Sequence, residues 1–131
     1  MPNNLIDVIV RFRVKPGKLE IYKQAMDFIL STAEAKEPYV LEYNIYKNAE
    51  GVHTQYERYA DEAALHRHLE VTMDGQIKWA EATEIEQVII LGDMSEQFWN
   101  LYGNENTHGY SLFRKIKRQN LVANPFALRR R

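Results

Sequence analysis

The order in which two hydrophobic periods alternate along the chain constrains its fold most strongly. Residues 5–14 and 84–91 have the alternating or continuous apolar pattern of strands, and residues 40–47 and 52–59 flank a short turn, which predicts a hairpin. Residues 19–33 and 61–80 repeat apolar side chains every three to four positions, which predicts two amphipathic helices. The resulting order, β-α-β-β-α-β, is typical of a ferredoxin-like α+β unit.

Local signals set the expected ends of these elements. The first helix is expected to stop at Glu37-Pro38, because a residue before proline avoids the helical region. Asp61 and Ser95 are expected N-caps, the second for a short helix, and Asp74-Gly75 is expected to interrupt the helix that follows Asp61. The predicted core faces, in chain order, are Ile6, Val8, Val10, Phe12, Val14; Leu19, Tyr22, Met26, Ile29, Ala33; Leu41, Tyr43, Ile45; and Ala64, Leu65, His68, Leu69, Ile77, Ala80.

The second face of the sheet needs a separate explanation, because two helices cover only one face. Ile9, Val88 and Ile90 sit among polar neighbours on what we take to be that face. An exposed apolar face favours association with another protein surface, so we expect a homodimer.

Composition narrows the class of protein. The 131 residues suit one domain, and 45% hydrophobic and 27% charged residues are ordinary for a globular chain. No apolar run reaches the roughly 20 residues of a membrane span, and residues 1–4 lack signal-peptide features. The chain has no cysteine, which excludes disulfides and thiolate sites. We therefore expect a cytoplasmic protein without a membrane partner.

The charge is unevenly distributed. Residues 1–113 carry ten basic and eighteen acidic side chains, whereas residues 114–131 carry seven basic and no acidic ones. An acidic body argues against nucleic acid as the main partner, because phosphate contacts need clustered positive charge. We expect a folded domain at 1–103 and a basic C-terminal extension at 104–131, either an arm drawn to the acidic body of the dimer or a disordered tail; RNA or anionic membrane is the alternative partner. Tyr102, Tyr110 and Phe113 are expected near the mouth of a pocket.

Several short motifs resemble the antibiotic biosynthesis monooxygenase family. They are Val10–Lys18, Glu37-Pro38, Glu42–Tyr46 and, most clearly, Tyr56–Leu65 followed by His68. The resemblance covers about residues 5–95. It implies a dimeric α+β barrel, in which two ferredoxin-like units join through their sheets, and it implies quinol or polyketide monooxygenases that need no flavin, haem or metal. The family also includes an isomerase.

The chain departs from the family pattern at two positions. Met73 stands where many relatives have a second histidine, and Tyr59 stands where tryptophan is common. Both departures weaken the transfer of catalytic roles to this chain. Around Lys78-Trp79 there is no counterpart of the histidine that ligates haem in the haem-degrading relatives, so haem is not expected.

His68 and Glu57 are the predicted catalytic residues. His68 lies on the apolar stripe of its helix, where a neutral imidazole can take a proton from a phenol or enol. Glu57, on the third predicted strand, would orient His68 and stabilise its protonated form. The structural alternatives are a hydrogen-bonded core histidine and a glutamate that is solvated or lies at a dimer interface.

Four further side chains are predicted to bind substrate. Tyr43 and Tyr59 can stack on a flat phenol, Asn44 can bond a carbonyl, and His53 shares a strand face with Glu57. Filling of the core explains the tyrosines equally well. No metal site is expected, because His66 and His68 point apart on a helix, and no phosphate loop or dinucleotide fingerprint occurs.

The resemblance implies a cofactor-independent monooxygenase, and the residues supply its candidate base and substrate-binding groups. Its partners would be molecular oxygen and a small aromatic substrate of the quinol, phenol or polyketide type, with His68 as the base. An isomerase or lyase acting on a small carbonyl compound, and a dimer that binds a small molecule without turnover, are the alternatives.

Overall fold

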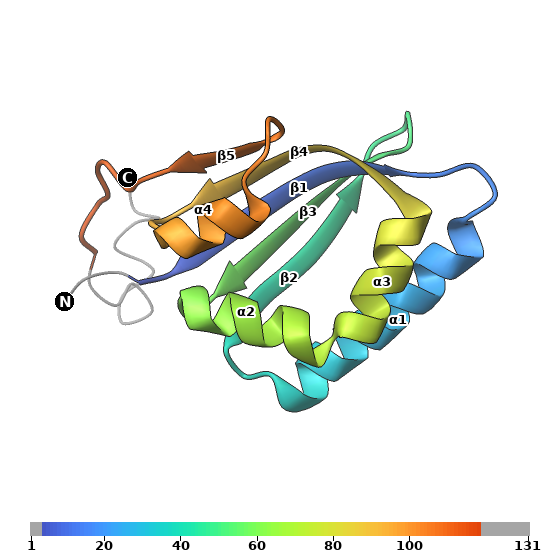
Figure 1. Cartoon of the computed structure of the whole chain (residues 1–131), viewed down its shortest axis with the longest axis horizontal. Coiled ribbons are helices and arrows are strands. Elements are labelled where there is room, and N and C mark those ends of the chain that lie inside the picture. The colour runs from blue at the N-terminus through green and yellow to red at the C-terminus, as the bar shows by residue number, and fades with distance from the viewer. Residues whose placement is uncertain (1–3, 119–131) are drawn as a thin grey trace, which may run out of the picture.

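The computed structural model describes residues 4–118, which form an α+β fold with a five-stranded sheet (Figure 1). The strand order is β2-β3-β1-β4-β5; neighbouring strands are antiparallel except β4 and β5, which are parallel. The first six elements follow the predicted ferredoxin-like order once α2 and α3 are taken together. The elements are β1 Ile6–Val14, α1 Leu19–Lys36, β2 Val40–Lys47, β3 Val52–Tyr59, α2 Glu62–Val71, α3 Met73–Ala82, β4 Thr83–Leu91, α4 Glu96–Tyr102 and β5 Thr107–Tyr110.

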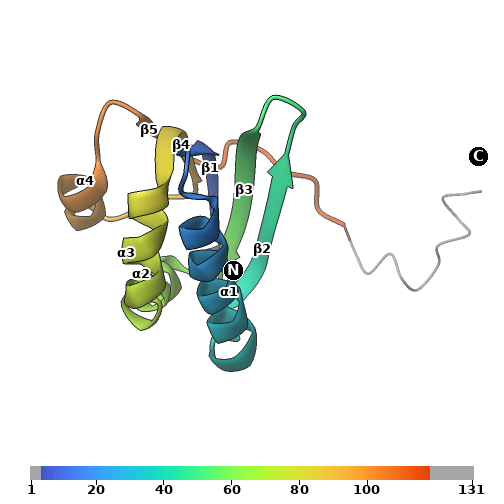
Figure 2. The ribbon, with the colours of Figure 1, turned by 90° about the vertical axis from the view of Figure 1, so that its right-hand side faces the viewer.

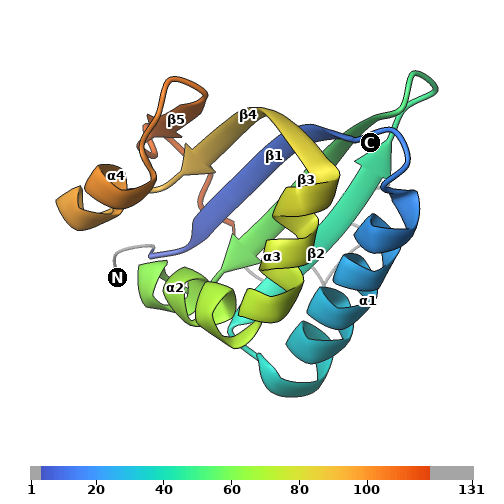
Figure 3. The ribbon, with the colours of Figure 1, turned by 45° about the vertical axis from the view of Figure 1, so that its right-hand side comes forward.

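Helices α1, α2 and α3 cover one face of the sheet (Figure 3). Alternation along β1 places Ile6, Val8, Val10 and Phe12 beneath them, as predicted. The expected caps are also present, since the Asp61 carboxylate accepts from the Ala64 amide at 2.8 Å and the Ser95 hydroxyl from the Phe98 amide at 3.1 Å.

The opposite face differs from the predicted one. Val88 and Ile90 pair in register with Val10 and Val8, so they point toward the helices, and of the three predicted residues only Ile9 lies on the outer face. The prediction failed because the apolar run of β4 does not reveal which residues of β1 it faces.

Charged side chains occupy much of this outer face. Arg58 donates two hydrogen bonds to the Asp7 carboxylate, at 2.8 and 3.0 Å, and Tyr56 donates a third at 2.9 Å. Burial raises the pKa of Asp7, but these hydrogen bonds outweigh it and hold the pKa below the usual value.

The second predicted helix is broken at Thr72, so α2 and α3 are separate, and Gly75 is helical rather than a breaker. The buried stripe nevertheless continues at helical spacing through Thr72, Gly75 and Trp79, while the predicted Ile77 is 60% exposed and Ala80 is exposed too. Small and polar residues on the inner stripe concealed it from a hydropathy pattern.

Gly75 allows α3 to lie close against α1, and the two helices run side by side in Figure 2. A Cβ atom at this position would lie 2.7 Å from side-chain carbons of both Ile29 and Phe28. That distance is well inside van der Waals contact, so the absence of a side chain sets the spacing of these helices.

Two other predicted core residues are exposed. Leu41 is 46% exposed because a bulge between Val40 and Glu42 turns it out of the alternation of β2. Leu19 lies at the first residue of α1, where the sheet does not cover it, and is also exposed.

The sheet continues past the predicted domain boundary at residue 103. β5 pairs with β4 from Val88↔Thr107 to Leu91↔Tyr110, so four residues assigned to the extension form an edge strand. The chain then runs beside Asp7 and Arg58 on the outer face, where Phe113 is 90% exposed. Of the predicted basic tail at 114–131, residues 119–131 with the three final arginines lie outside the described residues. No helix between residues 4 and 118 is long and apolar enough to cross a membrane.

Candidate functional site

A cavity of about 300 Å³ lies between the sheet and the helices. Its sheet side is formed by aliphatic residues of β1 and β4, and its helix side by apolar residues of α2, α3 and α4. Polar groups gather where β2 and β3 reach it. The aliphatic and apolar lining residues are Val8, Val10, Ile85, Val88, Ile90, Leu65, Leu69, Trp79 and Phe98, and the polar ones include Tyr43, Gln55, Glu57 and Gln76.

Part of the cavity wall comes from the segment beyond β4. Tyr102, Asn104 and Thr107 line it, as the sequence predicted for Tyr102. Tyr110 and Phe113 lie instead along a groove beside Asp7 and Arg58, so the expectation that they fold over the mouth is wrong. The parallel register of β5 explains this, because Tyr110 is opposite Leu91 at the far end of β4.

Glu57 is the buried carboxylate of the cavity wall, 7% exposed and located on β3. The Tyr59 hydroxyl donates to its Oε1 at 2.5 Å, and the Gln55 amide donates to its Oε2 at 2.6 Å. Burial raises the pKa of Glu57, and these two hydrogen bonds and the charge of His68 offset the rise only in part. Glu57 therefore holds a proton more tightly than a solvated carboxyl does.

His68 is paired with Glu37 and not with Glu57. Its Nδ1 lies 2.9 Å from Glu37 Oε1, and both side chains are fully buried. A carboxylate only accepts, so Nδ1 carries the proton in this pair. Glu37 also accepts from the Tyr39 hydroxyl at 2.9 Å. The predicted role of Glu57 as the group that orients His68 is thus wrong. Glu37, at the C-terminal end of α1, contacts His68 on α2 instead.

His68 stands behind the cavity wall rather than on it. Its ring packs against Tyr43 and Tyr59, with centroids 5.7 and 5.5 Å away. Its Nε2 lies 3.5 Å from the amide nitrogen of Gln76, which does line the cavity. A ligand would therefore meet Tyr43, Gln76 or Glu57 before it met the imidazole.

The two predicted tyrosines lie at the polar end of the cavity. Tyr43 lines it and accepts from the Gln55 amide at 2.9 Å, while Tyr59 packs beneath Glu57. Burial raises the pKa of both phenols well above the ordinary value, and the nearby Glu57 charge raises it further. Both hydroxyls therefore stay protonated and act as hydrogen-bond donors at neutral pH.

The other two predicted binding residues lie elsewhere. His53 stacks on Phe12 with ring centroids 5.0 Å apart, and its Nδ1 lies 3.2 Å from the Gly51 carbonyl. Asn44 pairs with Tyr56 in register, which puts it on the outer face, where its amide donates to Glu42. Neither lines the cavity, because the His53 ring packs on Phe12 and Tyr22 and Asn44 points away from the helices.

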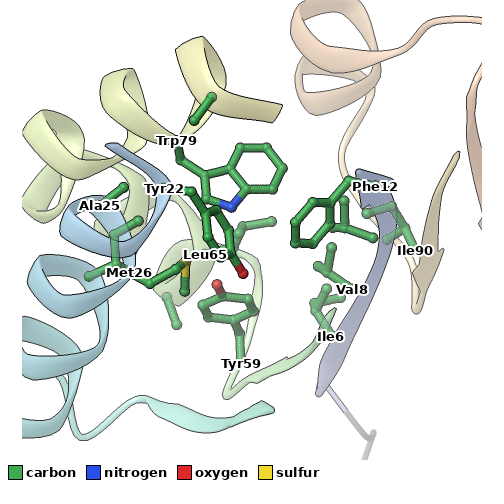
Figure 4. Packing of buried hydrophobic residues seen from close by; sticks show 14 of the residues in the cluster. Ile6, Val8, Phe12, Tyr22, Ala25, Met26, Tyr59, Leu65, Trp79 and Ile90 are labelled. Carbon is green, nitrogen blue, oxygen red and sulfur yellow. The ribbon is translucent and has the colours of Figure 1, made fainter. Parts of the chain in front are cut away.

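Sequence reasoning assigned no site role to Glu37, Gln76 or Trp79. Glu37-Pro38 served as a helix stop signal and as one of the family motifs, but Glu37 lies 31 residues before its partner His68 and was not paired with it. Gln76 and Trp79 belong to the inner stripe of α3, which extends the spacing of Leu65 and His68 and could have been found by that spacing. Figure 4 shows Trp79 in the buried cluster with Phe12, Tyr22 and Tyr59.

The described residues offer no group of three or more His, Asp or Glu side chains arranged to hold a metal ion. The chemistry that the cavity walls themselves can supply is proton transfer and hydrogen bonding. Glu57 can accept a proton, and Tyr43 and Gln76 can orient a polar group.

Comparison with known proteins identifies the fold. MupZ from Pseudomonas fluorescens superimposes with a TM-score of 0.73 at 19% identity, over 88% of this chain and 96% of its own. A proposed antibiotic biosynthesis monooxygenase from Caulobacter crescentus matches 67% of this chain and 86% of its own (TM-score 0.56, 22% identity). One from Nitrosomonas europaea matches 73% and 96% (TM-score 0.58, 20% identity).

Two sequence-based comparisons gave no match. No family model matches the chain, and no curated protein matches its sequence. The unit from β1 to β4 makes up about two thirds of the chain, so the 88% match with MupZ must extend into the segment that follows β4. At identities of 19–22% these likenesses establish a shared fold, as the sequence resemblance predicted.

Proposed function

From the antibiotic biosynthesis monooxygenase-like fold and the cavity it carries, we propose that this protein is a small oxygenase that needs no resident cofactor. Its substrate is a compact aromatic hydroxyl compound of the quinol, phenol or polyketide type, and its co-substrate is molecular oxygen. The observation that carries the proposal is the Glu57 carboxylate, buried and with a raised pKa, on the wall of an otherwise apolar cavity.

Glu57 is the proposed proton acceptor, because it meets the cavity directly. A general base works best when its pKa lies near the working pH, and burial moves Glu57 in that direction. Hydrogen bonds from Tyr59 and Gln55 fix the carboxylate in place. His68, held by Glu37, acts through its packing against Tyr43 and Tyr59, and Tyr59 in turn donates to Glu57. This makes His68 a positioning residue.

The chemistry balances without an outside reductant. Glu57 takes the proton of the aromatic hydroxyl, and the resulting anion passes one electron to oxygen, giving a substrate radical and superoxide. Their recombination forms a carbon–oxygen bond. Glu57 returns its proton to the peroxide. The attacked carbon also carries a hydrogen, and loss of this hydrogen with the terminal hydroxyl as water breaks the oxygen–oxygen bond and leaves a carbonyl. Each oxygen molecule thus supplies one atom to product and one to water. The apolar cavity keeps bulk water from the radicals.

Oxygen uptake tests the proposal. The purified full-length chain, treated with a chelator, is assayed with hydroquinones, naphthols and anthrones, and ¹⁸O₂ labelling follows the transferred atom. We expect protein-dependent uptake, with Glu57→Gln slower by about 100-fold or more. Asp27→Asn, which removes an exposed carboxylate on α1, serves as the matched control and should leave the rate unchanged.

Two outcomes would contradict the proposal. Uptake that survives Glu57→Gln would remove Glu57 from the chemistry. Absence of uptake, together with protein-dependent exchange of an acidic C–H proton into heavy water, would favour the isomerase. Glu37→Gln, which keeps an acceptor for His68, should slow turnover less than Glu57→Gln does if His68 only positions the site.

A further inference from the structure

The segment that follows β5, residues 111–118, presents large apolar side chains that its own domain does not cover. Leu112, Phe113 and Ile116 are all exposed, and Phe113 is 90% exposed. In Figure 2 the segment runs away from the rest of the fold. Several exposed apolar side chains together indicate a surface that contacts another protein surface.

The same segment carries a concentrated positive charge. Four basic side chains follow Phe113, and none of them makes an ion pair with any other residue in 4–118: Arg114, Lys115, Lys117 and Arg118. Residues 1–113, by contrast, carry ten basic and eighteen acidic side chains. The segment is therefore complementary in charge to the body of this chain and to the body of a second copy.

A groove between α1 and β2 has the matching character. Leu30, Val40 and Leu41 line it, and Leu30 and Leu41 are exposed. Glu34 and Glu42 lie in the same groove, and within the described part of the chain neither carboxylate pairs with a basic side chain. The groove thus combines exposed apolar surface with two unpaired negative charges.

The strand beside this groove is an open edge of the sheet. In the order β2-β3-β1-β4-β5, β2 pairs only with β3 among residues 4–118. Its other side therefore presents unpaired amides and carbonyls. Residues 111–118 belong to no helix or strand, and a segment of this kind can add to an open edge through main-chain hydrogen bonds.

The segment and the groove do not meet within one chain. None of residues 111–118 lines the groove; the start of the segment lies instead beside Asp7 and Arg58. The segment leaves from β5, which is the edge of the sheet opposite to β2. A second copy can bring the two surfaces together, and two-fold symmetry then forms the contact twice.

We propose that residues 111–118 bind in the groove between α1 and β2 of a second copy of this chain. The apolar side chains of the segment cover Leu30 and Leu41, and its basic side chains face Glu34 and Glu42. The contact borders the candidate site, because Tyr43 lines both this groove and the cavity. It does not depend on the proposed reaction, since it rests on the surface of the fold alone.

Cross-linking identifies the copy that receives the segment. The chain has no cysteine, so each introduced cysteine is unique. Full-length Ile116→Cys and Leu41→Cys variants are incubated together and treated with a short bis-maleimide, and mass spectrometry identifies the linked peptides. We expect a link between residues 41 and 116, which can form only between copies because each variant has one cysteine. Ile77→Cys, on the exposed side of α3, replaces Leu41→Cys as the matched control and should not link to residue 116.

Sedimentation equilibrium measures the contribution of the contact to the Kd of the dimer. Phe113→Ala should weaken the dimer by about 10-fold or more, because each symmetric dimer loses the contact twice. Phe113 is exposed in the single chain, so its replacement should not affect folding. Glu34→Gln combined with Glu42→Gln should also weaken the dimer and make its Kd less sensitive to salt. Ile77→Ala is the control and should leave the Kd unchanged.

Three results would overturn the inference. A chain with cysteines at both 41 and 116 that links only within itself would place the segment on its own body. A wild-type chain that stays monomeric at high micromolar concentration, or a dimer that Phe113→Ala does not weaken, would remove the contact. Binding to phosphatidylserine vesicles that Phe113→Ala abolishes, with the Kd of the dimer unchanged, would make the segment a membrane anchor instead.

Discussion

Replacing Glu37 by Leu is expected to destabilise the fold by about 3–5 kcal/mol. The substitution leaves His68, which is fully buried, without the carboxylate that lies 2.9 Å from its Nδ1. The second contact of Glu37, with the partly buried Tyr39 hydroxyl, adds little because water can replace it. A domain of this size has a free energy of unfolding of roughly 5–15 kcal/mol, so the loss is a large fraction of the total.

Urea titration followed by circular dichroism measures this loss, and a double-mutant cycle isolates the pair. Glu37→Leu combined with His68→Leu should recover about 2–3 kcal/mol relative to the sum of the single variants, because no unpaired buried group remains. Glu81→Leu, which breaks the exposed ion pair with Lys18, is the control and should cost less than about 1 kcal/mol. A Glu37→Leu variant within about 1 kcal/mol of wild type, or additive single effects, would refute the reasoning.

Three further predictions concern other regions. Burial raises the pKa of Glu57, so stability is lost as the pH rises from the ordinary carboxyl value of 4.5 through the higher folded-state pKa. Over that range Glu57→Gln should become increasingly stable relative to wild type in urea titrations. Gly75→Ala should cost about 1–3 kcal/mol in thermal unfolding despite the better helix propensity of alanine, because its Cβ would meet Ile29 at 2.7 Å. Hydrogen bonds from Arg58 and Tyr56 lower the pKa of Asp7 despite its burial, so the ionised carboxylate contributes stability that is lost as the pH falls. Asp7→Asn lacks this contribution, so its free energy of unfolding should fall by about 1 kcal/mol less than that of wild type at acid pH.

Each of these has an outcome that contradicts it. A pH-independent difference between Glu57→Gln and wild type would mean that Glu57 has an ordinary pKa in the folded state. A Gly75→Ala variant as stable as wild type would show that α1 and α3 can move apart freely. If Asp7→Asn loses stability at low pH as steeply as wild type and the exposed control Asp27→Asn do, the hydrogen bonds from Arg58 do not hold Asp7 ionised.

The elements with long regular periods could be predicted from the sequence. Alternation from Ile6 to Phe12 and helical spacing from Tyr22 to Ala33 each identify a single buried face, and the structure confirms both. Prediction failed where a single residue interrupted the period, or where a continuous apolar run showed no period. The bulge before Glu42 exposes Leu41, and the run Val88–Leu91 carries no alternation that shows which residues face the helices.

The candidate site was harder to predict, because its contacts join distant parts of the chain. The sequence places His68 on a buried stripe, but it does not show that Glu37 at the end of α1 will approach it. Glu57 was identified as a member of the polar face of β3, and only the packing of the helices shows that this face meets a cavity. Trp79 was concealed because its stripe is shared with Thr72 and Gly75 rather than with large apolar residues.

The central position of β1 has a consequence for how the chain folds during synthesis. β1 leaves the ribosome first, yet one of its two neighbours, β4, begins about 70 residues after β1 ends. At roughly 5–20 residues per second, several seconds pass before β4 emerges. During that interval β1 can pair only with β3, and its other edge exposes unpaired amides and carbonyls to neighbouring nascent chains. Pairing of β4 with β1, which comes late in synthesis, thus covers the exposed edge of the earliest of these strands.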